Sequence, residues 1–147
     1  MNRRELLLGA AAMAATAVAG SAMAAEHDHM MHDHHAMANP HEKLLAAAAD
    51  CVLKANLCLQ HCITLLGQGD TSMAACAQTS SQVIAMCGAL EQMAAADSKF
   101  LPQLAKVCME VCKACEETCR KTEKHPECKA CKESCIACYE ECKKIAA

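Results

Sequence analysis

The spacing of cysteines is the feature of this chain that most directly suggests a chemistry. Fourteen of its 147 residues are cysteines, and nine of them lie between Cys108 and Cys142. Within each half of that stretch the cysteines are three or four residues apart, which returns a side chain to the same face of an α-helix. The pattern predicts two helical stripes of thiols separated by the His125-Pro126 break. The complete set is Cys51, Cys58, Cys62, Cys76, Cys87, Cys108, Cys112, Cys115, Cys119, Cys128, Cys131, Cys135, Cys138 and Cys142.

Binding of several Cu(I) ions is the function that these stripes favour. Soft thiolates select Cu(I), and two of them can hold one ion, so each pair along a stripe can serve as a chelate. At about one copper per thiolate the filled interior would be close to neutral. Metal–sulfur bonds would also replace the apolar core that a sequence with a single Phe and a single Tyr cannot build from large side chains.

Three other uses of the thiols remain open. Disulfides along one helix would be strained, because Cβ atoms three or four residues apart lie about 5–6 Å from each other, whereas bridges between helices are possible. A structural zinc store would leave a buried charge of about −2 on each four-thiolate site. Thiol redox catalysis would need a strand before the reactive pair, which is missing, so we expect no enzyme. The Cys-x-x-Cys pairs that have zinc-ligand spacing are Cys112–Cys115, Cys128–Cys131 and Cys135–Cys138.

The elements that would position these thiols read as four helices, over residues 41–66, 71–95, about 98–124 and 126–145. Asn39-Pro40 begins the first, and Gly67–Asp70 breaks the chain before the second, with Asp70 or Thr71 as its cap. Four helices of about twenty residues with short connections predict an all-α, antiparallel four-helix bundle with a cysteine-lined core.

A register follows if both turns of such a bundle lie at the same level. Counting inward from the turns then sorts the cysteines into layers about one helical turn apart. The first layer is Cys62, Cys76, Cys119 and Cys131, the second Cys58, Cys115 and Cys135, the third Cys112 and Cys138, and the last Cys51, Cys87, Cys108 and Cys142, with Cys128 alone near the turns. Ala55, Ser80 and Val83 fill the gaps, and the faces become apolar beyond the last layer at Leu44, Leu45, Leu90, Leu101, Leu104 and Ile145.

The first 24 residues have the pattern of a cleaved twin-arginine signal peptide. Arg3-Arg4 precedes an Ala-rich apolar run that ends in Ala22-Met23-Ala24, a cleavage signal. We therefore expect a periplasmic or otherwise exported protein with no membrane anchor after cleavage. The formal net charge of −3 gives no indication of nucleic-acid binding.

Residues 25–40 predict a disordered, His- and Met-rich linker that precedes the bundle of residues 41–147. A His-rich tract of this kind is typical of metal binding. If cleavage follows Ala24, the amine, two amides and the His27 imidazole could bind Cu(II) or Ni(II) in a square plane. Met73, one turn from Cys76, and His125, at the turn before the last helix, are further candidate copper ligands. His61 points about 100° away from Cys62, so we expect it at the surface.

Several of these motifs resemble the copper storage proteins. The segments that carry the resemblance are Cys58-Leu59-Gln60-His61-Cys62, the run from Cys112 to Cys119, and the run from Cys128 to Cys142. The resemblance implies a four-helix bundle whose core thiolates hold many Cu(I) ions, a tetramer in exported members, and copper supply to enzymes such as methane monooxygenase. Exported relatives can carry a His immediately before the first core cysteine, where this chain has Asp50.

Overall fold

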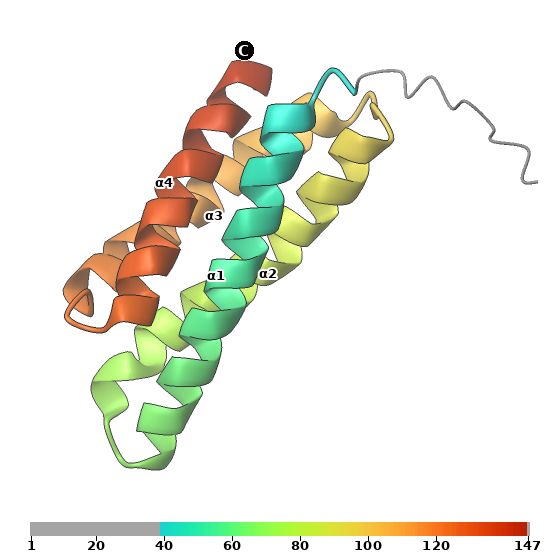
Figure 1. Cartoon of the computed structure of the whole chain (residues 1–147). Helices are drawn as coiled ribbons and strands as arrows, with labels where there is room; N and C mark the ends of the chain where they lie inside the picture. Colours follow the sequence, from blue (N-terminus) through green and yellow to red (C-terminus); the bar gives the residue numbers. More distant parts are fainter. Residues whose placement is uncertain (1–38, 147) are drawn as a thin grey trace, which may run out of the picture. The chain divides into compact units, whose positions relative to one another are not determined.

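The computed structural model describes residues 39–146, which form four α-helices and one short 3₁₀ helix. These are α1 (Glu42–Gly67), η2 (Thr71–Met73), α2 (Ala74–Ala95), α3 (Leu101–Lys121) and α4 (Pro126–Ile145). Helices α1 and α3 each pack against both α2 and α4, and Figure 1 shows neighbouring helices running in opposite directions. The predicted all-α, antiparallel four-helix bundle is confirmed. The predicted signal peptide and His27 lie outside the described residues.

Local chemistry sets the helix ends close to their expected positions. Asp70 caps η2 by accepting a hydrogen bond from the Ser72 backbone N–H at 3.1 Å. Gly69 precedes it with a φ of 92°, a left-handed conformation that a residue without Cβ adopts readily. Pro102 and Pro126 lie in the first turns of α3 and α4, where a missing N–H costs nothing. The second helix differs from prediction only in opening with the 3₁₀ turn.

Two side chains fasten the beginning of α1 to the end of α2. The Asn39 side-chain amide donates to the carbonyl oxygens of Ala94 and Ala95, both at 3.2 Å. His41 Nε2 lies 2.8 Å from Asp97 Oδ1 in the connection that follows α2. The Asn39 bonds satisfy carbonyl groups at a helix end, and both side chains close the end of the bundle opposite the two turns.

The interior changes from hydrocarbon to sulfur along its length. Leu44, Leu90 and Leu101 are buried at the closed end, with Leu45, Leu104 and Ile145 partly buried against them. All fourteen cysteines are buried further along the bundle. Ala55, Ser80 and Val83 are fully buried on the same faces, as predicted. The bundle is therefore a cysteine-lined core with an apolar plug.

The two hairpins are offset along the bundle axis, which corrects the predicted layers. The α1–α2 turn reaches beyond the α3–α4 turn (Figure 1). As a result Cys128, expected alone near the turns, lies with Cys58, Cys62 and Cys76. Cys51 and Cys87 likewise meet Cys112 and Cys138 and not the expected Cys108 and Cys142. The shift is about one helical turn, and it preserves sulfur contacts because the stripes repeat at that same interval.

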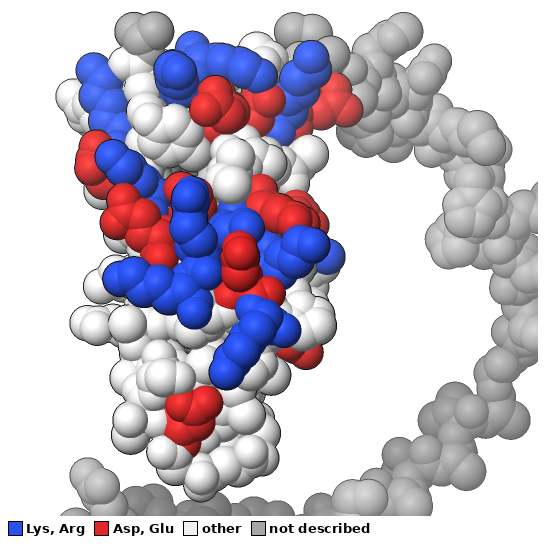
Figure 2. Space-filling view, turned by 90° about the vertical axis from the view of Figure 1, so that its left-hand side faces the viewer, with Lys and Arg blue, Asp and Glu red and all other residues white. Residues whose placement is uncertain are grey.

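Charge is unevenly distributed over the surface of the bundle. Figure 2 shows a face dense in both charge signs toward one end and nearly free of charge toward the other. The sequence accounts for this difference, since Asp70 is the only Asp, Glu, Lys or Arg between residues 55 and 90. Among residues 39–146, no helix is long and apolar enough to cross a membrane.

The apolar plug should carry much of the stability of the metal-free protein. We expect Leu90→Ala, at a fully buried site, to lower the free energy of unfolding by about 2–5 kcal/mol. Leu57→Ala is the matched control, because Leu57 is 52% exposed and the same substitution should change stability by less than about 0.5 kcal/mol. Urea denaturation of both metal-free variants measures the difference. Equal losses would show that the plug is not where the bundle gains its stability.

Candidate metal centre

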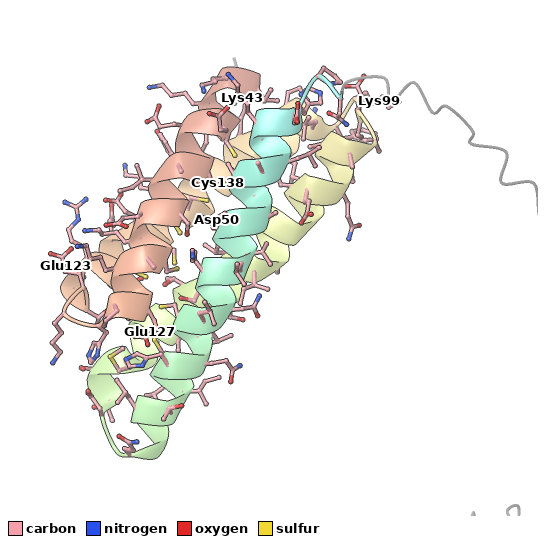
Figure 3. The ribbon with its side chains drawn as sticks, viewed as in Figure 1. Lys43, Asp50, Lys99, Glu123, Glu127 and Cys138 are labelled. Carbon is pink, nitrogen blue, oxygen red and sulfur yellow. The ribbon has the colours of Figure 1, made fainter. Side chains whose placement is uncertain are left out.

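The thiols face one another across the interior of the bundle. Each of the fourteen is a free cysteine, and none is more than 1% exposed. The sulfur–sulfur contacts range from 3.4 Å, between Cys76 and Cys119, to 4.0 Å, between Cys58 and Cys62. These are contacts of S–H groups, well beyond the roughly 2.05 Å of a disulfide bond. Figure 3 shows the sulfur atoms between the ribbons, with Cys138 among the residues labelled.

Twelve of these cysteines gather into four groups whose sulfur atoms lie within 4.8 Å of one another. We call the first the turn-end group and the second the inner group. The turn-end group is Cys58, Cys62, Cys76 and Cys128, the inner group is Cys51, Cys87, Cys112 and Cys138, and two groups of three between them are Cys58, Cys119 and Cys131, and Cys115, Cys131 and Cys135. Each group draws on at least three helices except the last, which spans α3 and α4.

Shared atoms join three of the groups, and one sulfur–sulfur contact adds the inner group. Cys58 belongs to the turn-end group and to the first group of three, and Cys131 belongs to both groups of three. A contact of 3.8 Å between the sulfur atoms of Cys51 and Cys135 connects the inner group to the rest. A thiolate can bridge soft metal ions, so shared sulfurs suit a cluster of ions better than a set of separate sites.

The remaining two cysteines, Cys108 and Cys142, lie beyond the groups toward the apolar plug. The Cys108 thiol donates to the Met86 carbonyl oxygen at 3.5 Å. The hydrogen bond with Cys138 raises the pKa of Cys142, and desolvation and repulsion from Cys138 and Cys108 raise it further. Both were predicted ligands, and both are buried where they could extend the inner group.

Burial and mutual contact control the protonation of these thiols. Desolvation raises the pKa of Cys108 to about 12, with further repulsion from Cys138 and Cys51. Hydrogen bonds from Cys112 and Cys135 instead lower the pKa of Cys51 to about 5. The pKa of Cys87 is raised by its contacts with Cys112 and Cys138. Within a group, one cysteine can thus be a thiolate that accepts hydrogen bonds from the S–H groups of its neighbours. A metal ion that binds there must displace the protons of those neighbours.

The other predicted ligands have different surroundings. Met73 is fully buried and packs in the core one turn from Cys76. His125 is the residue before α4, and its ring contacts that of His61, with 4.7 Å between the centroids and a tilt of 54°. His61 is half-buried, with 24% of its side chain exposed, so it lies at the surface only in part. Asp50, in place of the His of some relatives, is exposed on α1.

Comparison with known proteins identifies the family. The family profile described as copper storage protein matches residues 37–147. The chain belongs to the copper storage protein family. Its structure is similar to apo copper storage protein 3 from Bacillus subtilis, with 27% sequence identity and a TM-score of 0.64, over 72% of this chain and 98% of that one. It is equally similar to the Cu(I)-bound copper storage protein BsCsp3, at 26% identity and a TM-score of 0.64, over 72% and 97% of the two chains. No curated protein matches the chain.

Membership of this family agrees with the architecture described above. One of the two similar structures is a Cu(I)-bound protein, and the chain covers nearly all of it. The resemblance inferred from the cysteine motifs is therefore confirmed, and with it the assignment to a family of metal-binding storage proteins. The clustered core thiols are the groups through which this chain could bind metal.

The raised thiol pKa values predict loss of stability at alkaline pH in the metal-free protein. The pKa of Cys108 is about 12 when folded and 9.0 ordinarily, so its thiol favours the folded state fully below pH 9. That contribution, at most about 4 kcal/mol at roughly 1.4 kcal/mol per pH unit, should be lost as the pH rises from about 9 to about 12. Anaerobic urea denaturation across this range tests it, and Cys108→Ala should show a shallower decline than the parent protein. An identical decline in the variant would contradict the assignment.

Proposed function

We propose that this protein stores several Cu(I) ions as thiolate complexes inside the bundle. The observation that carries the proposal is the sharing of Cys58 and Cys131 between neighbouring sulfur groups. Together with the Cys51–Cys135 contact, the shared sulfurs make the interior one continuous array of thiols, to which ions can be added without closing any single site. Soft, low-coordinate Cu(I) suits such an array better than ions that require a fixed number of hard ligands.

Charge supports copper over the zinc alternative. The turn-end and inner groups each hold four sulfur atoms, the number that a closed zinc site uses. Filled with Zn²⁺ and four thiolates, each would bury a charge of about −2. No Lys or Arg among residues 39–146 is buried, so no basic side chain of the interior would compensate. Copper at about one ion per thiolate leaves the interior nearly neutral at every stage of filling.

Bound copper would also supply cohesion that the thiols lack. A cysteine buries little apolar area, and an S–H group is a weak hydrogen-bond donor. Metal–sulfur bonds that connect all four helices would stabilise the folded state by linkage, since the unfolded chain has no preformed site. The protein acts in this account as a non-enzymatic store whose stability rises with its load.

Export and delivery complete the proposed function. The twin-arginine signal at residues 1–24 and the His- and Met-rich residues 25–40 support a periplasmic or otherwise exported store. The resemblance supports copper supply to a cuproenzyme and assembly as a tetramer. N-terminal sequencing of the protein recovered from the periplasm should begin at Ala25, which would place His27 third and form the proposed Cu(II) site. Any other first residue would remove that site.

Anaerobic Cu(I) titration followed by native mass spectrometry tests storage directly. We expect successive additions of copper to each chain, up to on the order of one ion per thiolate. The copper should survive a challenge with excess Zn²⁺, because thiolates hold Cu(I) more tightly. Metal-free protein should show fourteen reactive thiols when unfolded, one for each cysteine. Saturation at one or two ions, or displacement by zinc, would favour the structural zinc alternative. Absence of reactive thiols would favour disulfide bonds.

We expect the loss of a shared sulfur to lower the copper capacity more than the loss of a sulfur outside the groups. Cys58→Ala removes an atom common to two groups, so we expect the loss of more than one copper ion per chain. Cys142→Ala removes a buried thiol outside the groups and should cost no more than about one ion. Both changes remove one sulfur from the interior and leave a methyl group. Native mass spectra of the two loaded variants give the comparison, and equal capacities would show that the groups do not act as a network.

A further inference from the structure

Two histidines meet where the two hairpins approach each other at the turn end. His61 lies in α1 immediately before Cys62, and His125 is the last residue before α4. Their rings are 4.7 Å apart between centroids and tilted by 54°. The thiol storage described above uses neither imidazole. Their contact joins the α1–α2 hairpin to the connection between α3 and α4.

Each ring presents a buried nitrogen with nothing to bind. Within the described part of the chain, His61 Nε2 and His125 Nε2 are buried and have no hydrogen-bond partner, and neither has Glu127 Oε2 beside them. A buried polar atom without a partner costs roughly 1–3 kcal/mol. The two ring nitrogens in one place are therefore an unfavourable arrangement for the empty protein, and a cation bound to both would relieve it.

Glu127 is positioned to orient the His61 ring. Its Oε2 lies 3.5 Å from His61 Nδ1. Figure 3 places Glu127 in the first turn of α4, next to α1. In metal sites a carboxylate beside one ring nitrogen holds the proton there and leaves the lone pair of the other nitrogen free for the metal. With the proton on Nδ1, the free lone pair of His61 is on the buried Nε2.

The connection that carries His125 is held in place by its own bonds. The His125 N–H donates to the Thr122 carbonyl at 3.0 Å, and the Lys129 N–H donates to the His125 carbonyl at 3.0 Å. Lys132 of α4 pairs with Glu123 at 2.5 Å. The His125 side chain makes no capping bond of its own. The His125 backbone is therefore held in place while its imidazole makes no capping bond. A metal ligand needs both properties.

We propose that His61 and His125 bind a divalent ion of borderline softness, such as Zn²⁺, through their Nε2 atoms, and that this ion closes the turn end of the copper core. Two imidazoles with a supporting carboxylate suit such an ion. Among the described residues no further His, Cys, Asp or Glu side chain converges on the pair, so water would complete the coordination. Because one ligand comes from each hairpin, the ion would link the hairpins directly outside Cys62 and Cys128.

The binding of Zn²⁺ by the two histidines does not depend on the proposed copper storage. The closure of the turn end by that ion does rest on it. Thiolates would take the same ion more strongly in the metal-free protein, so the histidine site should fill once copper occupies the core. A linked turn end would then slow the loss of copper from the turn-end group. The site therefore predicts two separate effects, one on imidazole nitrogens and one on the rate of copper removal.

Nitrogen NMR of the imidazole rings tests the binding in the full-length mature protein. Copper loading is first verified by native mass, so a failure of storage is seen before any zinc is added. Cu(I) and Zn²⁺ are both diamagnetic, and added Zn²⁺ should shift the Nε2 resonances of His61 and His125 together. Glu127→Gln should weaken the zinc affinity about 10- to 100-fold. If copper does not load, the same resonances should still shift once Zn²⁺ exceeds the thiols. Unmoved Nε2 resonances would overturn the site.

Copper removal by a Cu(I) chelator tests the closure. Zn²⁺ should slow it at least several-fold in the parent protein and leave it unchanged in His61→Gln and His125→Gln. His41→Gln is the matched control, since His41 also has a buried, unpartnered ring nitrogen but lies at the closed end, against Asp97. In the His41→Gln variant, Zn²⁺ should slow copper removal as much as in the parent protein. An effect of zinc that survives in both His61→Gln and His125→Gln, or is absent in the parent protein, would overturn the closure.

Discussion

A cysteine side chain gives the interior of a helical bundle one carbon and one sulfur atom where leucine would give four carbons. Fourteen such side chains fill most of this core, so the helices are brought together over small residues that bury little apolar area each. Hydrocarbon is concentrated instead at one end, around Leu44, Leu90 and Leu101. The plug holds the empty bundle together and leaves the remaining length free to carry ligands.

Protonation connects this packing to metal binding. The thiols of the empty core are neutral enough to be buried because most keep their protons, and desolvation raises the pKa of Cys62 as it does that of Cys108. A copper ion that replaces a proton exchanges one positive charge for another. The interior can therefore fill without accumulating charge, and each ion adds bonds between helices that the protons did not provide.

The helices and their inward faces could be predicted because a repeat of three or four residues has one solution on each helix. The last helix was predicted over residues 126–145, and α4 spans them. The offset between hairpins could not be predicted. A stripe that repeats every turn still meets sulfur after sliding by one turn, so periodicity does not specify the depth at which Cys128 meets Cys58. The contact between His61 and His125 could not be predicted for the same reason, because no pattern in α1 indicates that the α3–α4 connection lies beside it.

The same offset accounts for the chemistry of the turn end. If the turns were level, Cys128 would be isolated and His61 would have no partner across the bundle. Sliding α1 and α2 outward by a turn brings Cys128 into a four-sulfur group and sets His61 against His125. Donor atoms then change along the axis from nitrogen and oxygen at the turns, to sulfur, to hydrocarbon at the plug. An ion that prefers sulfur gains by moving inward and one that accepts nitrogen gains by staying outside, so a single displacement of two hairpins can separate two classes of metal.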